Sequence, residues 1–247
     1  MPSSPRFHPQ ELTGRASSHV VELDSPRCVL HREVVADFLG LRAAAAAAGI
    51  DLTPVSSFRD FARQLTIWNA KCRGERELLD REGRPLDPAS LDEEGLVGAI
   101  LYWSALPGAS RHHWGTELDL IDAAALPAGL RPQLTQAEYA AGGIFAPLDR
   151  WLELHAAEHG FFRPYAVDRG GFQPEPWHVS HAAVAQAALA EFSVETLRDA
   201  LDAVELEAAV TVGARLPEIF DRYVLNVAPP PALALARATV SPASRPS

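Results

Sequence analysis

The chain has 247 residues, of which 47% are hydrophobic and 22% are charged, and its formal net charge is −10. This composition is that of an ordinary globular protein with one good-sized hydrophobic core. The negative charge argues against nucleic acid as a partner, because neutralising phosphates requires a concentrated basic face. The sequence has no run of about 20 apolar residues that could span a bilayer.

Residues 1–20 are rich in proline, serine and polar groups, which predicts a loosely held N-terminal arm. They lack the apolar core of a signal peptide, so we expect no export by such a signal and a cytoplasmic protein. The two cysteines stand far apart and outside any Cys-x-x-Cys pair, which favours free thiols over a zinc ribbon or a redox site.

The first predicted elements are two helices separated by a short strand. Residues 32–49 carry a long apolar series and end at Gly49, a residue that commonly follows the last turn of a helix. Residues 52–55 are expected to form a strand. Asp60 is a suitable N-cap for a second helix, which extends to about residue 72.

The middle of the chain is less regular. Charged residues with several glycines and prolines make 73–95 an exposed excursion, and 96–106 is apolar enough to be either helix or strand. Alternating polar and apolar residues predict a strand at 117–121, and 145–159 is expected to be an amphipathic helix. Further strands are expected at 161–165 and 175–180.

Helices are also expected near the C-terminus, at 184–189, 194–206 and 216–227. The final residues, 228–247, are rich in proline, alanine and serine and predict a disordered tail. We therefore expect an α+β fold, with a small, mainly antiparallel sheet flanked by helices. The sheet-containing domain is placed at 21–182 and a C-terminal helical extension at 183–227.

Two short motifs concentrate residues that bind metals. The first runs from Ser110 to Asp119 and the second from Glu175 to His178. His112, Asp119 and His178 supply three nitrogen or oxygen ligands, which is the number that catalytic zinc usually takes from protein. Glu175 is left over beside them, where a general base is needed. The pattern predicts a zinc hydrolase whose metal site is carried by the sheet.

These motifs resemble the LAS group of zinc peptidases, and within it the D-alanyl-D-alanine carboxypeptidases and dipeptidases of the vancomycin-resistance type. The family pattern is Ser-x-His-x-x-Gly-x-Ala-x-Asp, followed by Glu-x-x-His. Its members are matched here by Ser110, His112, Gly115, Asp119, Glu175 and His178. Glu117 stands where the small alanine is usual. In a strand it shares the face of Asp119, where it could perturb the field of the metal or point past the end of the strand.

An upstream block resembles the substrate-binding segment of the same family, Ser-Tyr/Phe-Arg followed by Gln. Its counterparts here are Ser57, Arg59 and Gln64. The resemblance implies a catalytic role for Arg59, since a guanidinium can bind a substrate carboxylate or the tetrahedral oxyanion with forked geometry. Ser57, Gln64 and Ser110 are the predicted hydrogen-bond partners of the substrate.

The resemblance implies a Zn²⁺-dependent peptidase that hydrolyses D-Ala-D-Ala-type termini of peptidoglycan peptides. One alternative is a peptidoglycan endopeptidase of the phage-lysin kind, although the C-terminal helices do not look like a wall-binding module. The other is a zinc-binding interaction module without catalysis, against which the intact Glu175 argues. The sequence patterns leave the oligomeric state open, as well as the choice between dipeptidase and carboxypeptidase.

Overall fold

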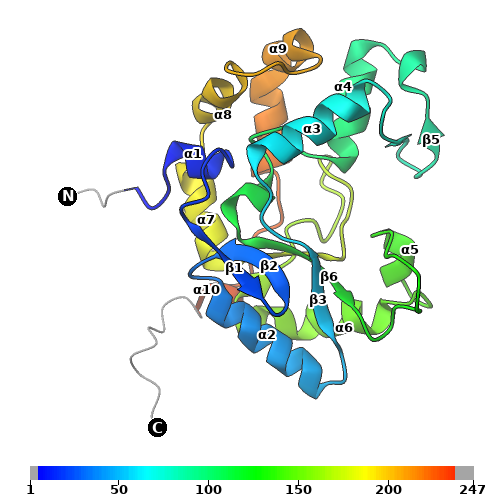
Figure 1. The fold of residues 1–247 in the computed structure, drawn as a ribbon, viewed down its shortest axis with the longest axis vertical. Coiled ribbons are helices and arrows are strands. Elements are labelled where there is room, and N and C mark those ends of the chain that lie inside the picture. Colours follow the sequence, from blue (N-terminus) through cyan, green and yellow to red (C-terminus); the bar gives the residue numbers. More distant parts are fainter. Residues whose placement is uncertain (1–4, 237–247) are drawn as a thin grey trace.

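A four-stranded sheet lies at the centre of the molecule. The computed structural model describes residues 5–236, and its sheet has the strand order β3-β6-β8-β7, with each neighbouring pair antiparallel. Figure 1 labels β3 and β6 in the middle of the molecule. The strands are β3 (Leu52–Ser56), β6 (Glu117–Asp122), β7 (Phe161–Phe162) and β8 (His178–His181). All four predicted strand regions therefore meet in one sheet, which confirms the α+β prediction.

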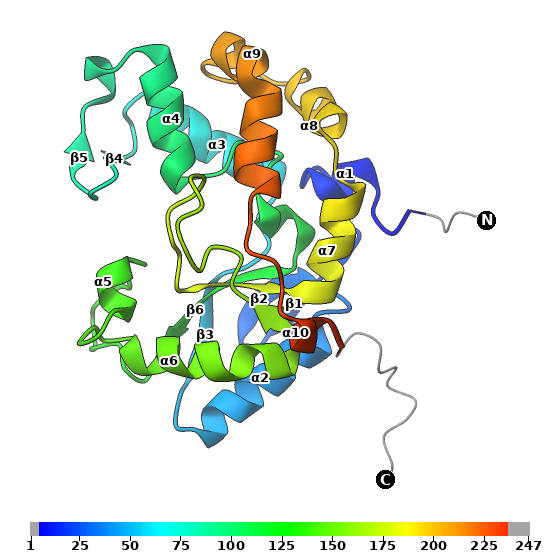
Figure 2. The ribbon, with the colours of Figure 1, turned by 180° about the vertical axis from the view of Figure 1, so that it is seen from behind.

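Two helices run along the lower side of this sheet in both ribbon views. They are α2 (Val35–Ala47) and α6 (Ala146–His155), and α6 continues as a 3₁₀ turn, η3 (Ala156–His159) (Figures 1 and 2). Strand side chains alternate between faces, and the apolar ones Leu118, Leu120 and Val179 are fully buried. The opposite face of β6 and β8 carries polar side chains.

The upper part of the molecule, as seen in Figure 1, is mainly helical. The helix α3 (Phe61–Cys72) begins as predicted after Asp60, whose side chain accepts a hydrogen bond from the Arg63 backbone N–H at 2.7 Å. The apolar segment 96–106, which the sequence left open, lies mostly in the helix α4 (Glu93–Trp103), which Asp92 caps in the same way. Between α3 and α4 lie a short hairpin and a 3₁₀ turn: β4 (Leu78–Leu79), β5 (Pro85–Leu86) and η1 (Pro88–Ser90).

The C-terminal helices share a core with the sheet. They are α7 (Ala182–Glu191), α8 (Val194–Leu201) and α9 (Ala209–Ile219), which continues as a π-helical segment, η4 (Phe220–Leu225). Their apolar side chains, among them Ala188, Leu197 and Leu216, belong to the same hydrophobic cluster as Leu118 and Val179. The predicted helical extension is thus packed as an integral layer of the structure.

Residues 5–20 differ from the loosely held arm that their composition predicts. They include a short helix, α1 (Pro9–Leu12), and the side chains of Phe7 and Leu12 are only 3% and 2% exposed. The Leu12 carbonyl accepts a hydrogen bond from the indole of Trp114 at 3.1 Å. Apolar anchors hold this segment against the domain despite its polar composition. A hairpin of β1 (Val20–Asp24) and β2 (Arg27–His31) follows it.

Two short helices complete the described part of the chain. A short helix, α5 (Gln136–Tyr139), precedes α6, and another, α10 (Ala232–Ala236), lies within the predicted tail. Ala234 in α10 is buried, whereas the remainder of that tail, 237–247, lies outside the described residues. Within residues 5–236, none of the helices has the length and hydropathy that crossing a membrane requires.

Candidate metal centre

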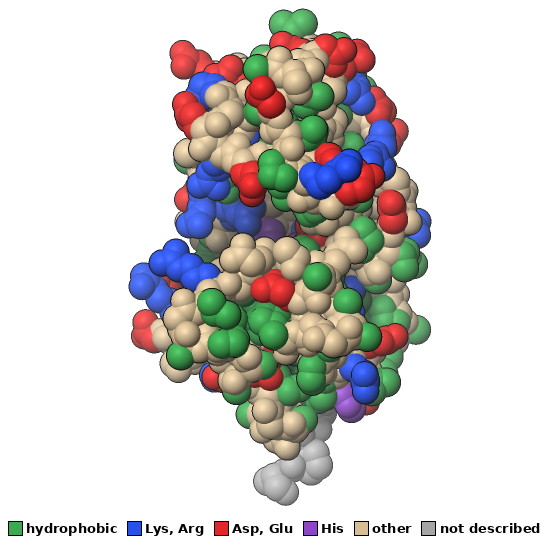
Figure 3. Space-filling model, turned by 90° about the vertical axis from the view of Figure 1, so that its right-hand side faces the viewer, with side chains coloured by type: hydrophobic (Ala, Val, Ile, Leu, Met, Phe, Trp, Pro, Cys, Tyr) green, Lys and Arg blue, Asp and Glu red, His purple; other side chains and the backbone are tan. Residues whose placement is uncertain are grey.

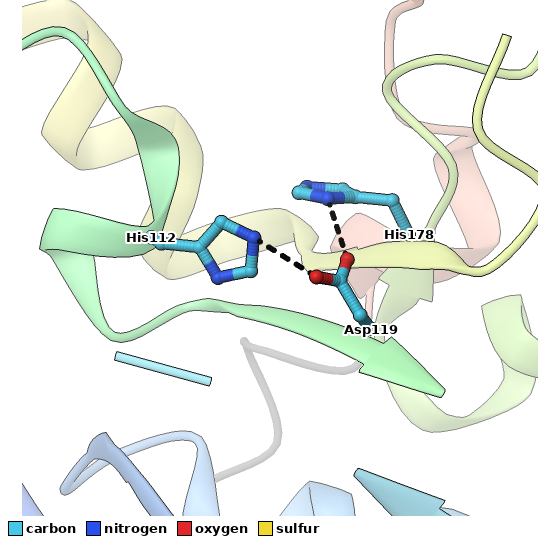
Figure 4. A group of neighbouring side chains, drawn as sticks. All are labelled: His112, Asp119 and His178. Carbon is cyan, nitrogen blue, oxygen red and sulfur yellow. Dashed lines mark hydrogen bonds and ion pairs between the residues drawn. The ribbon is translucent and has the colours of Figure 1, made fainter. Parts of the chain in front are cut away.

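The three predicted ligands converge from three separate elements. His112 lies in a 3₁₀ turn, η2 (Arg111–Trp114), Asp119 lies in β6, and His178 is the first residue of β8 (Figure 4). One ligand atom of each lies within 4.8 Å of the others. The Asp119 carboxylate is 3.5 Å from Nε2 of His112 and 3.1 Å from Nδ1 of His178. This is a cluster that could hold one metal ion.

The register of the sheet brings two of the ligands together. Asp119 is the direct cross-strand partner of His178, and Glu117 is the partner of Ser180. Directly opposed residues of an antiparallel pair share a face, so all four side chains lie on the side of the sheet away from Val179. The alternation of polar and apolar residues in β6 therefore places Asp119 as predicted.

Gly115 makes the sharp turn between His112 and β6. Its backbone has φ +67°, which is left-handed, and a Cβ added there would lie 2.5 Å from the Val20 side chain and 2.7 Å from the His31 nitrogen. A side chain at this position would therefore collide with the β1–β2 hairpin. The glycine allows the hairpin to pack against the turn that presents His112.

Hydrogen bonds to the outer ring nitrogens orient both histidines. Nδ1 of His112 is 2.8 Å from the Ser57 carbonyl oxygen, and Nε2 of His178 is 2.7 Å from a Glu117 carboxylate oxygen. Both partners are acceptors, so each outer nitrogen is assigned the N–H. The inner nitrogens, which lie beside Asp119, would then offer their lone pairs to a bound metal, as metal-binding histidines do. The donor set and its tautomers fit zinc.

The charges at the site favour a cation between the ligands. Burial alone would raise the pKa of Asp119, but His112 and His178 outweigh it and lower this pKa to about 2. Burial would lower the pKa of His178, yet hydrogen bonds to Asp119 and Glu117 raise it to about 10. The lowered pKa of Asp119 and the raised pKa of His178 both indicate that the cluster favours positive charge, which a divalent ion would supply.

Glu175 lies beside the cluster in the turn that leads into β8. Its carboxylate is 3.4 Å from Nδ1 of His178, and its carbonyl accepts a hydrogen bond from the His178 backbone N–H at 3.1 Å. The predicted strand at 175–180 therefore begins three residues later than expected, because that hydrogen bond closes a turn and Pro176 has no N–H for a ladder. Burial raises the pKa of Glu175 to about 7, against the opposing charges of His178 and Arg59.

These groups line one cleft of about 280 Å³. Figure 3 shows it as a hollow between the upper and lower parts of the molecule, with histidine atoms inside and basic side chains at its edge. The metal cluster, Glu175, Arg59 and Ser110 all contribute to its lining. Ser110 is thus placed where the sequence predicted it, directly before the turn that carries His112.

Ser57 and Gln64, the other predicted hydrogen-bond partners of the substrate, are not among the residues that line this cleft. The Ser57 hydroxyl accepts a hydrogen bond from the Val29 backbone N–H at 3.0 Å, while its carbonyl orients His112. The fully buried Gln64 accepts a hydrogen bond from the Arg59 guanidinium at 2.8 Å and donates one to the Ala105 carbonyl at 2.7 Å. Both residues form hydrogen bonds with residues that line the cleft: Ser57 with His112, and Gln64 with Arg59.

Lys71 and Tyr165 also line the cleft, although the sequence analysis did not single them out. Lys71 follows Gln64 by two helical turns on the same side of α3, a spacing that could have revealed it. Its pKa is lowered by burial and by the nearby Arg76 and Arg59, and it has no ion pair within residues 5–236. The ring of Tyr165 lies 4.9 Å from that of His178.

Some known proteins resemble the chain in sequence, and others resemble it in structure. An uncharacterised protein of Haemophilus influenzae is 45% identical over 104 residues, which are 41% of this chain and 71% of that protein. A vancomycin-resistance D,D-pentapeptidase solved in complex with Zn(II) is 21% identical, with a TM-score of 0.48 over 70% of this chain and 84% of that one. VanYB in complex with D-alanine-D-alanine is 20% identical, with a TM-score of 0.47 over 75% and 89%.

The family match covers the sheet and the whole metal cluster. The model of the VanY family, described as D-alanyl-D-alanine carboxypeptidase, matches residues 27–184. This range includes both metal-binding motifs and the block that contains Arg59, and it spans more than half of the 247 residues. The chain therefore belongs to the VanY family of D-alanyl-D-alanine carboxypeptidases.

Proposed function

We propose that this chain is a zinc-dependent carboxypeptidase or dipeptidase that acts on D-Ala-D-Ala-type termini of peptidoglycan peptides. The observation that carries the proposal is the placement of Glu175 beside His112, Asp119 and His178 in a single cleft. Membership of the VanY family supports the substrate class. A merely structural zinc site would have four protein ligands and would leave no reason for a free carboxylate beside them.

His112, Asp119 and His178 would hold the zinc through Nε2, a carboxylate oxygen and Nδ1, the atoms that face one another. Bound zinc would polarise the substrate carbonyl and make water acidic enough to be deprotonated near neutral pH. The remaining chemistry belongs to the side chains of the cleft, which must move protons and bind the charged ends of the peptide.

Glu175 is the proposed proton carrier. It accepts a proton from the attacking water and delivers it to the leaving amine, so the same carboxyl group serves first as base and then as acid. Its raised pKa, about 7, results chiefly from burial and lies in the range where both transfers are favourable near neutral pH. The carboxylate reaches the cleft because the turn before β8 directs it there.

Arg59 is the proposed anion-binding group. Gln64 and Ser56 accept hydrogen bonds from its guanidinium, at 2.8 and 3.2 Å, and no carboxylate within residues 5–236 forms an ion pair with it. A half-buried guanidinium without a carboxylate partner suits a substrate that brings one. Lys71 adds a second positive charge to the same cleft. This charge distribution favours a peptide with a free C-terminal carboxylate.

The decisive experiment measures released D-alanine from zinc-loaded protein. D-Ala-D-Ala dipeptide and a stem pentapeptide ending in D-Ala-D-Ala are offered separately, and the Glu175→Gln protein serves as the matched control. Release of D-alanine by the wild type and not by the control supports the proposal. A stoichiometrically zinc-loaded wild type that releases none from either substrate would refute it. Cleavage only of internal bonds in cross-linked muropeptides would replace it with an endopeptidase.

A further inference from the structure

Glu117 is the one departure from the family's metal motif, and it is completely buried at 0% exposure. Its carboxylate does not point past the end of the strand. One oxygen lies 2.7 Å from Nε2 of His178, on the far side of the ring from Asp119. The residue therefore contacts a proposed ligand from behind and does not complete the ligand set.

The second oxygen of Glu117 collects the other donors. It lies 3.1 Å from the guanidinium of Arg111, 2.7 Å from the Ser180 hydroxyl and 2.9 Å from the Thr116 hydroxyl. With the imidazole N–H of His178, these donors satisfy both oxygens, as a buried carboxylate requires. Each of these four partners is at most 3% exposed.

Arg111 carries the charge opposite to that of Glu117, and it is also buried. It is 3% exposed, its guanidinium lies 4.7 Å from the ring centroid of Trp114, and it donates a hydrogen bond to Ser180 at 2.8 Å. Removing one partner of a buried ion pair leaves an uncompensated charge, which costs far more than removing both. The two residues should therefore behave as one unit.

This unit connects the three elements that present the ligands. Arg111 directly precedes His112 in η2, Glu117 lies two residues before Asp119 in β6, and Ser180 lies two residues after His178 in β8. A contact network across all three fixes their relative positions. It also supplies the acceptor that keeps the N–H of His178 on Nε2 and its lone pair on Nδ1.

We propose that Glu117 and Arg111 form a neutral, buried positioning unit that orients His178 for metal binding. The inference rests on the zinc site of the proposed function. Glu117 accepts the Nε2–H of His178, and Arg111 cancels the negative charge that this acceptor brings into the protein. Replacing Glu117 with the alanine of the family pattern should therefore impair zinc binding by this chain, and replacing Arg111 as well should add less than the loss that Arg111→Ala causes alone.

The test is the zinc dissociation constant, measured by competition with a chromophoric chelator. It compares the wild type with Glu117→Gln, Glu117→Ala, Arg111→Ala and the double Arg111→Ala/Glu117→Ala protein. Loss of a hydrogen-bond partner behind a metal-binding histidine typically weakens metal affinity about 10–100-fold. We expect a loss of that size for Glu117→Ala and a smaller loss for Glu117→Gln, whose amide oxygen still accepts from His178. The double variant should lose less than the product of the two single losses.

Two controls separate positioning from general destabilisation. The thermal midpoint of each metal-free variant shows whether it folds, and Asp149→Ala breaks an ion pair with Arg163 of 2.7 Å that lies outside the cleft. That control should lower the midpoint without changing zinc affinity. A ¹⁵N–¹H spectrum of the zinc-loaded wild type should show a protonated Nε2 on His178, and this signal should shift in Glu117→Gln.

Any of three results would refute the proposed role of Glu117 and Arg111. The first is an unchanged zinc affinity of folded Glu117→Ala, and the second is a loss of affinity in the double variant equal to the product of the two single losses. The third is a zinc-loaded wild type in which His178 is protonated on Nδ1. Because these measurements need no substrate, they stand apart from the peptidase assay. A wild type that binds zinc but releases no D-alanine would refute the proposed function and leave the unit intact. A wild type that binds no zinc would refute both.

Discussion

Replacing Arg59 with alanine separates an exopeptidase from an endopeptidase. An exopeptidase must recognise a free C-terminal carboxylate, and Arg59 is a half-buried cation in the cleft whose bonded partners, Gln64 and Ser56, carry no charge. A hydrogen bond to a charged group contributes about 1.5–3 kcal/mol. Since about 1.4 kcal/mol corresponds to a factor of ten, Arg59→Ala should lower kcat/KM by about one to two decades on free-acid peptides.

The assay compares a peptide ending in D-Ala-D-Ala with the same peptide bearing a C-terminal amide. If Arg59 binds the carboxylate, the loss in kcat/KM should be much larger for the free acid than for the amide. The matched control is Arg63→Ala, which removes an exposed cation from the adjacent turn of α3 and should affect neither substrate. Equal losses on both peptides, mainly in kcat, would assign Arg59 to the oxyanion instead. No loss on either would refute its role at the site.

The remaining predictions concern proton transfer, metal binding and pH. Glu175→Gln should retain stoichiometric zinc and lose about 10²–10⁴-fold in kcat; loss of zinc by metal analysis would make Glu175 a ligand. His112→Ala and His178→Ala should each lose stoichiometric zinc in the same analysis, and retention by both would place the metal elsewhere. Burial lowers the pKa of His31 in the folded protein from 6.5 to about 4. The unfolded chain therefore binds more protons between these values, so stability is present above pH 6.5 and falls as the pH drops. His31 should account for about 2 kcal/mol of lost unfolding free energy between pH 7 and pH 5; an equal loss in His31→Gln, measured by urea unfolding, would contradict this.

The sequence alone singled out His112, Asp119 and His178 as candidate ligands and predicted the strands that carry Asp119 and His178. The alternation in 117–121 predicts a strand with Asp119 on one face, and the pattern of the two motifs selects His112, His178 and Glu175 from nine histidines and many carboxylates. These features are local, because strand periodicity and ligand spacing depend on residues close together in the chain. The structure brings all four together as predicted.

Local ambiguity was settled by packing. The apolar segment 96–106 has no decisive period, and it forms most of α4 because its apolar residues Val97, Ile100 and Leu101 enter the shared core. The polar composition of residues 5–20 concealed Phe7 and Leu12, which are buried against the domain. A segment with few apolar residues can be well ordered when those few reach a core that the rest of the chain supplies.

Only the tertiary structure determined which residues form hydrogen bonds with the candidate ligands. Ser57 and Gln64 carry the residue types of a substrate-binding block, yet in the structure their side chains form hydrogen bonds with Val29 and Arg59. The role of Glu117 depends on Arg111, six residues away in sequence, and on His178, which is 61 residues away. Spacing along the chain identifies which groups can bind a metal, whereas the partner of each ligand's second nitrogen depends on how separate elements pack together.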